Sequence, residues 1–193
     1  TSEMIDGIEY TWYPTPKYEQ NGVARVKNIL TFLKEVLLDS KNIVNEFQPD
    51  IVMASSTYPM DIWIAQRISK LSNAKLIYEV HDLWPLSPIE LGGMSPKHPF
   101  IQWCQLAENT AYKKSDAVVS ILPKVHEHMK AHGLDLKKLH IIPNGIVEEE
   151  WQTNQLENLT EGKLKQFLEE MKQQGKFIVG YAGSHGQPNA LQH

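Results

Sequence analysis

A cluster of residues with side chains suited to sugar chemistry lies at positions 80–85, directly after a short apolar run. His81 can hydrogen-bond a hydroxyl or stabilise charge, Asp82 can accept hydroxyl protons, and Trp84 offers a flat apolar face. The same residues also have a purely structural explanation, in which Trp84 packs under a sheet, Asp82 caps a turn and His81 satisfies a backbone group. We favour a functional loop because binding and catalytic residues often lie on loops that directly follow a strand.

A second candidate binding site is the loop that follows the apolar run at 177–181 and precedes Pro188, a residue suited to the first turn of a helix. Small residues there expose backbone amides, and a helix N-terminus would add the positive end of its dipole, so the loop could cradle a diphosphate. Its glycine spacing differs from the dinucleotide fingerprint, so nicotinamide or flavin binding is not indicated. A tight turn without a ligand is the alternative. The candidate residues are Gly183, Ser184, His185 and Gly186.

Three histidines lie in the helical pattern at 124–132: His126, His128 and His132. The last two are one turn apart and could share a metal ion in principle. The glutamate of the zinc-protease helix motif is absent and no cysteine lies near in sequence, so we predict a solvated face and no metal. Lysines make the region locally basic, so it could contact an anionic lipid surface or a phosphate-bearing acceptor. We favour the simpler interpretation that the lysines form a solvated face.

The elements that must position these residues alternate between strands and helices. Short apolar runs at 51–54, 76–78, 117–121 and 139–142 predict buried strands, and the intervening patterns at 22–47, 61–71, 100–114 and 124–132 predict helices. This order predicts an α/β fold with a doubly wound parallel sheet covered on both faces. Ligands bind such sheets beyond the carboxyl ends of the strands, which directs attention to residues 55–57, 81–82 and 143–145.

A second pattern begins after an acidic stretch without apolar periodicity. We predict a domain over 1–147, a linker over 148–162 and the start of another α/β domain over 163–193. The last of these contains an amphipathic helix with Leu164, Phe167, Leu168 and Met171 on one face, a cap at Gly175 and a strand at 177–181.

Composition, net charge and hydropathy limit the kinds of partner that the protein can have. The chain has 193 residues, 41% of them hydrophobic, and a formal net charge of -4, which gives no general attraction to nucleic acid. Cys104 is the single cysteine, so no intrachain disulfide can form; it shares a helical stripe with small apolar residues and is expected to pack rather than react. No apolar run approaches the roughly twenty residues that cross a bilayer. We expect a cytoplasmic protein, with contact to a membrane surface left open.

The ordered segments 49–52, 76–85, 115–120, 142–146 and 179–183 resemble, in order and spacing, the large family 4 of retaining glycosyltransferases. The aromatic form His81-Asp82-Leu83-Trp84-Pro85 is similar to the bacterial branch that builds capsule, O-antigen or exopolysaccharide. The resemblance implies the Rossmann-like GT-B architecture, in which two domains face each other across a cleft. It also implies that the first strands precede Thr1 and that the second domain is truncated at His193.

The resemblance further implies roles for particular residues. His81 matches the histidine that reaches the donor sugar, Asn144 matches a turn leading to the domain crossover, and Gly183 and Ser184 match a loop close to the donor diphosphate. Asp82 and Trp84 would shape the acceptor side. The implied reaction transfers a sugar from a nucleotide sugar to a saccharide or polyprenol-linked acceptor. It passes through a transition state with oxocarbenium character, with attack on the same face and no metal required.

Two other functions stay open at this point. A sugar-nucleotide epimerase or hydrolase shares the architecture, and fold alone does not separate it from a transferase. A non-catalytic sugar-nucleotide-binding subunit is the alternative outside the enzymes. The basic and acidic residues that would complete the donor site belong to the stretch expected after His193, so we expect this piece alone to be inactive.

Overall fold

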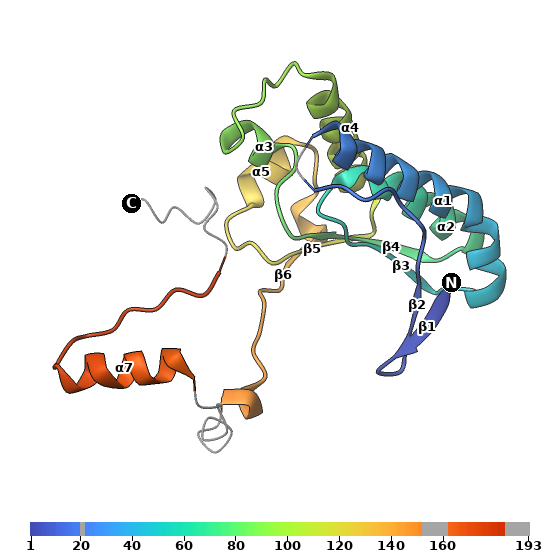
Figure 1. Cartoon of the computed structure of the whole chain (residues 1–193). Coiled ribbons are helices and arrows are strands. Elements are labelled where there is room, and N and C mark those ends of the chain that lie inside the picture. The colour runs from blue at the N-terminus through green and yellow to red at the C-terminus, as the bar shows by residue number, and fades with distance from the viewer. Residues whose placement is uncertain (20–21, 152–161, 184–193) are drawn as a thin grey trace. The chain divides into compact units, whose positions relative to one another are not determined.

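The computed structural model describes residues 1–19, 22–151 and 162–183. The chain divides into two compact units, Thr1–Pro143 and Asn144–His193. The elements, labelled as in Figure 1, are β1 (Ser2–Ile5), β2 (Ile8–Thr11), α1 (Val23–Phe47), β3 (Ile51–Ala54), η1 (Pro59–Asp61), α2 (Ile62–Ser72), β4 (Lys75–Val80), α3 (Leu86–Glu90), α4 (Pro99–Lys114), β5 (Ala117–Ser120), α5 (His126–Ala131), η2 (Leu136–Lys138), β6 (Leu139–Ile141), η3 (Glu148–Trp151) and α7 (Lys163–Gln173).

The centre of the first unit is a four-stranded sheet in the order β3-β4-β5-β6 with every neighbouring pair parallel. The predicted α/β class with a parallel sheet is therefore confirmed, and all four predicted strands are present. In the register, Ala54 lies opposite Tyr78 and Val80 opposite Ser120. The carboxyl ends of β3 and β4 consequently meet at one edge of the sheet.

One face of this sheet is buried and the other is not. Leu76, Tyr78 and Val80 point toward the helices and are at most 4% exposed, whereas Ile51 and Met53 on the opposite face are 58% and 48% exposed. Strand order follows chain order, so right-handed crossovers bring successive connecting helices to the same face. Figure 1 shows α1, α2, α4 and α5 on that one side. Within the described residues of the first unit, the helical cover expected on the second face is not present.

The core lies between the sheet and the helices α1, α2 and α4. Met60, Ile62, Tyr112 and Met129 are nearly inaccessible. The predicted stripe of α1 packs on α2, and the helix ends at Gln48, whose left-handed backbone lets its amide donate to the Val44 carbonyl. Cys104 is buried against the Met60 sulfur at 3.6 Å, which confirms its expected packing role.

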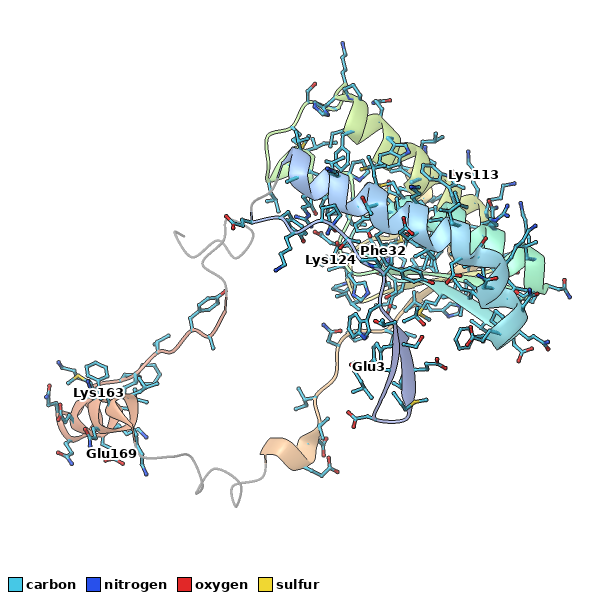
Figure 2. The ribbon with its side chains drawn as sticks, turned by 45° about the vertical axis from the view of Figure 1, so that its right-hand side comes forward. Glu3, Phe32, Lys113, Lys124, Lys163 and Glu169 are labelled. Atoms are coloured by element: carbon cyan, nitrogen blue, oxygen red, sulfur yellow. The ribbon has the colours of Figure 1, made fainter. Side chains whose placement is uncertain are left out.

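An N-terminal hairpin was not anticipated from the sequence. Strands β1 and β2 pair antiparallel around Asp6 and Gly7, which both have positive φ angles, as a two-residue type I′ turn requires. The hairpin's strand residues are exposed, and Figure 2 shows Glu3 among them. An Asp-Gly pair and the alternating residues Ile8–Thr11 were present in the sequence as signals, but Ser2–Ile5 on the other side of the turn does not alternate.

The second unit contains the predicted amphipathic helix as α7, which carries the labelled Lys163 and Glu169 in Figure 2. The chain turns at Gly175 with φ +71°, as expected for a glycine after a helix. The predicted strand at 177–181 is wrong for the structure described. Phe177 is 92% exposed and Val179 83% exposed, and no neighbouring strand in the described part of this unit supplies the hydrogen bonds that a strand needs.

Candidate functional site

Three polar side chains converge at the carboxyl ends of β3 and β4. Ser55 follows β3 directly, Glu79 is near the end of β4, and His81 follows that strand. Because Ala54 is registered with Tyr78, Ser55 and Glu79 come next to each other. Side chains two residues apart along a strand share a face, so His81 joins Glu79 on the sheet face that the helices leave uncovered.

The contacts within this group define the orientation of the histidine ring. Ser55 Oγ donates to Glu79 Oε2 at 2.5 Å and lies 3.0 Å from His81 Nε2, which is 3.2 Å from the same Glu79 oxygen. Since the hydroxyl hydrogen goes to Glu79, the serine oxygen acts as acceptor and Nε2 carries a hydrogen. We call these residues the Ser55–Glu79–His81 cluster. It holds the ring by Nε2 and leaves the Nδ1 edge for other chemistry.

The rest of the loop after β4 is tied down locally. Asp82 Oδ1 accepts a hydrogen bond from Ser87 Oγ at 2.5 Å, which links the start of the loop to helix α3. Trp84 packs edge-on against Phe100 with ring centroids 6.2 Å apart, and the Arg25 guanidinium lies 5.6 Å from the Trp84 ring centroid. The tryptophan is thus partly buried between α4 and the start of α1 rather than freely presented.

A buried carboxyl group lies behind the cluster. Asp61 precedes α2 and lines a cavity of about 230 Å³ between α1, β3 and α2, whose other polar residues are Ser55 and Ser56. Burial raises the pKa of Asp61 to about 6, opposed by weaker hydrogen bonds from Ser56, and its Oδ1 atom has no hydrogen-bond partner. A larger hollow of about 290 Å³ on the outer side of α2, beside Trp63 and Arg67, shares no residue with the cluster.

The remaining predicted site residues are placed as follows. Asn144 is exposed at the start of the second unit, and Gly183 is exposed in that same unit, where an added methyl group would meet the Tyr181 hydroxyl at 2.7 Å. Ser184, His185 and Gly186 lie outside the described residues.

The structure therefore places His81, Asp82 and Trp84 in one loop, confirms that Ser55, one of the residues 55–57 predicted at a strand end, lies beside His81, and adds Glu79. Ser55 follows a predicted strand, which was a usable signal. Glu79 stands two residues before His81, which was the only signal for it. Across the described residues, no helix combines the length and the apolar character needed to cross a membrane.

Comparison with known proteins gives one family. The model of Glycosyltransferase Family 4 matches residues 10–150, which include the Ser55–Glu79–His81 cluster. Among solved structures, the chain is similar to Anabaena Alr3699/HepE, crystallised in complex with UDP-glucose. The identity is 16% and the TM-score 0.44, over 80% of this chain and 34% of that one, so this chain spans about a third of that protein's length. None of the curated proteins matches. Since the family model covers well over half of the sequence, this chain belongs to glycosyltransferase family 4.

Proposed function

We propose that the protein is a retaining glycosyltransferase that moves a sugar from a nucleotide sugar to a saccharide or polyprenol-linked acceptor in the synthesis of a surface polysaccharide. The observation that carries the proposal is the Ser55–Glu79–His81 cluster at the carboxyl ends of two parallel strands, within the residues that the family model matches. This edge is where parallel α/β sheets bind ligands.

In the proposed reaction, His81 stabilises the charge that develops on the donor sugar as the nucleoside diphosphate leaves. The imidazole is useful there only if its orientation is set beforehand, because rotation during the reaction would reduce the electrostatic gain. Glu79 and Ser55 are positioning residues, since they contact Nε2 and leave the rest of the ring for the substrate. The step is electrostatic and positional, and we propose that it needs no metal ion.

The other predicted residues keep their proposed roles. Asp82 and Trp84 shape the acceptor side of the loop. The residues proposed for the donor diphosphate side are Gly183, Ser184, His185 and Gly186, and Asn144 is proposed to bind substrate at the turn leading to the domain crossover.

The test is an assay of nucleoside diphosphate release with a panel of nucleotide sugars, in the presence and absence of acceptor glycans and polyprenol-linked saccharides. It uses the protein in the form its cell makes. We expect His81→Ala to lower turnover by roughly tenfold or more, the scale of one lost transition-state contact, with nucleotide affinity nearly unchanged. Glu79→Gln should lower kcat and leave KM for the donor unchanged. His140→Ala, an exposed histidine on β6, is the matched control and should behave as wild type.

The same assay separates the alternatives. Acceptor-independent hydrolysis or isomerisation of the donor would replace the transferase proposal with a hydrolase or an epimerase. Donor binding without turnover on any acceptor would indicate a binding subunit. Wild-type rates in His81→Ala would refute the assignment of that residue. Turnover by the 193 residues alone would contradict our expectation that they are inactive by themselves.

A further inference from the structure

A second polar cluster lies between α4 and α5 and has no part in the proposed transfer reaction. It consists of Glu108 on α4 together with His128 and His132, which lie one turn apart at the end of α5. The sequence predicts a solvated face for His128 and His132, and this prediction is wrong because both side chains are partly buried. The His128 side chain is only 17% exposed, and its Nε2 lies 3.0 Å from Oε1 of Glu108, whose side chain is 1% exposed.

Three acceptors share the amide nitrogen of Gln105 beside this cluster. The amide nitrogen of Gln105 lies 2.6 Å from Glu108 Oε2, 3.0 Å from Asn109 Oδ1 and 2.9 Å from His132 Nδ1. An amide nitrogen carries two hydrogens, so it cannot donate fully to three acceptors. Turning the amide over would place its oxygen against the buried carboxylate. These three acceptors converge on the Gln105 amide nitrogen, and two of them, from Glu108 and His132, are atoms of metal-ligating side chains.

The ligand atoms are close enough to share one ion. The candidate atoms of Glu108, His128 and His132 all lie within 4.8 Å of one another, and the two imidazole rings have centroids 4.5 Å apart. Around a tetrahedral zinc ion with metal–nitrogen distances of roughly 2.0–2.1 Å, neighbouring ligand atoms are about 3.3 Å apart. Small side-chain rotations close the difference, since both histidines are only partly buried.

We propose that Glu108, His128 and His132 bind one divalent cation of the zinc class. Two imidazoles and one carboxylate are a ligand set that zinc accepts, with the fourth position left to water. Tyr112 donates to Glu108 Oε1 at 2.9 Å and would thereby hold the carboxylate in its orientation toward the ion. The ion would link α4 to the end of α5 and thereby brace the connection between β5 and β6.

The test is titration of the full 193-residue chain, freed of metal, with Co²⁺ as a spectroscopic probe and with Zn²⁺. We expect one equivalent to bind, with the intense visible absorption of a four-coordinate Co²⁺ site, displacement of Co²⁺ by Zn²⁺, and a rise in the unfolding temperature. His132→Ala should weaken Zn²⁺ binding by more than the roughly 10–100-fold typical of losing an outer-shell partner. His126→Ala is the matched control, because His126 is an exposed histidine on the same helix, and it should bind as wild type.

Folding is checked separately, since Glu108 is buried. Glu108→Gln keeps the size of the side chain and removes its charge, so its circular dichroism should match wild type while its Co²⁺ absorption is lost. Less than one equivalent bound to the wild-type chain would overturn the proposal. So would equal loss of affinity in His126→Ala and His132→Ala, or an unchanged Co²⁺ spectrum in Glu108→Gln.

Discussion

The titration of Asp61 tests the packing behind the Ser55–Glu79–His81 cluster. The carboxyl group lies in the wall of the cavity formed by α1, β3 and α2, with Ser55 and Ser56 as its polar neighbours. Burial disfavours its charged form, and Oδ1 lacks a hydrogen-bond partner. The perturbation is Asp61→Asn, which keeps the shape of the side chain and removes the ionisation.

The expected magnitude follows from the pKa. Burial raises it from 3.8 to about 6, and one unit corresponds to 1.36 kcal/mol, so the complete effect is about 3 kcal/mol. Because the folded state holds this proton more tightly than the unfolded state does, the stabilisation is fully present below pH 3.8. It is lost as the pH rises through 6. Between pH 5 and pH 8 the wild-type chain should lose about 1.4 kcal/mol from this group.

The assay is urea unfolding of wild type and Asp61→Asn at several values between pH 5 and pH 8. The free energy of unfolding of the variant minus that of wild type should increase by about 1.4 kcal/mol across this range, because only wild type carries the titrating group. Asp50→Asn, at the opposite end of β3, replaces an exposed carboxyl and should change the corresponding difference by less than about 0.5 kcal/mol. A difference for Asp61→Asn that stays constant, or that decreases with pH, would refute the reasoning.

Two further predictions concern packing away from the cluster. Gly92→Ala should destabilise the fold by about 1–3 kcal/mol, because the added methyl would lie 2.6 Å from the Pro88 carbonyl oxygen. Thermal unfolding of both variants is the measurement. Gly180→Ala, whose methyl meets nothing within 4 Å, should have a much smaller effect than Gly92→Ala. Burial raises the pKa of Cys104 to about 12, so at pH 8 Ellman's reagent should label the folded chain roughly a thousandfold more slowly than the urea-unfolded chain. Equal rates in the two states would show that the thiol is accessible.

The strands of the sheet were readable from the sequence because their signals are local. The run at 51–54 became β3 without change, and the run at 76–78 became the centre of β4. The extension of β4 to Glu79 was not predicted, because a carboxylate inside a strand contradicts a buried apolar run. It is tolerated there because alternate residues of β4 point to the uncovered face. The strand expected at 177–181 was wrong although its residues are apolar. They have no partner strand in the part of the second unit that the structure describes.

In both polar clusters the histidines could be identified from the sequence, but their contacts with other elements could not. His81 was identifiable from its place after an apolar run. Its contact with Ser55 depends on the pairing of β3 with β4. The same pairing brings Glu79 to Ser55, although the two residues are 24 positions apart in the sequence. His128 and His132 were visible as a pair one turn apart, whereas the buried carboxylate beside them comes from α4, 20 residues away from His128.

By itself, then, the sequence determined where the four strands of the parallel sheet and the helices α1, α2, α4 and α5 lie, the parallel α/β class, and the loop that carries His81. These follow from apolar periodicity and turn chemistry, which act over a few neighbouring residues. Only the tertiary structure decided that Ser55 and Glu79 hold the His81 ring, that Asp61 is buried behind them, and that Glu108 meets two histidines. Each of these contacts depends on strand register or helix packing, which arises from burial of the whole core and leaves no local mark in the sequence.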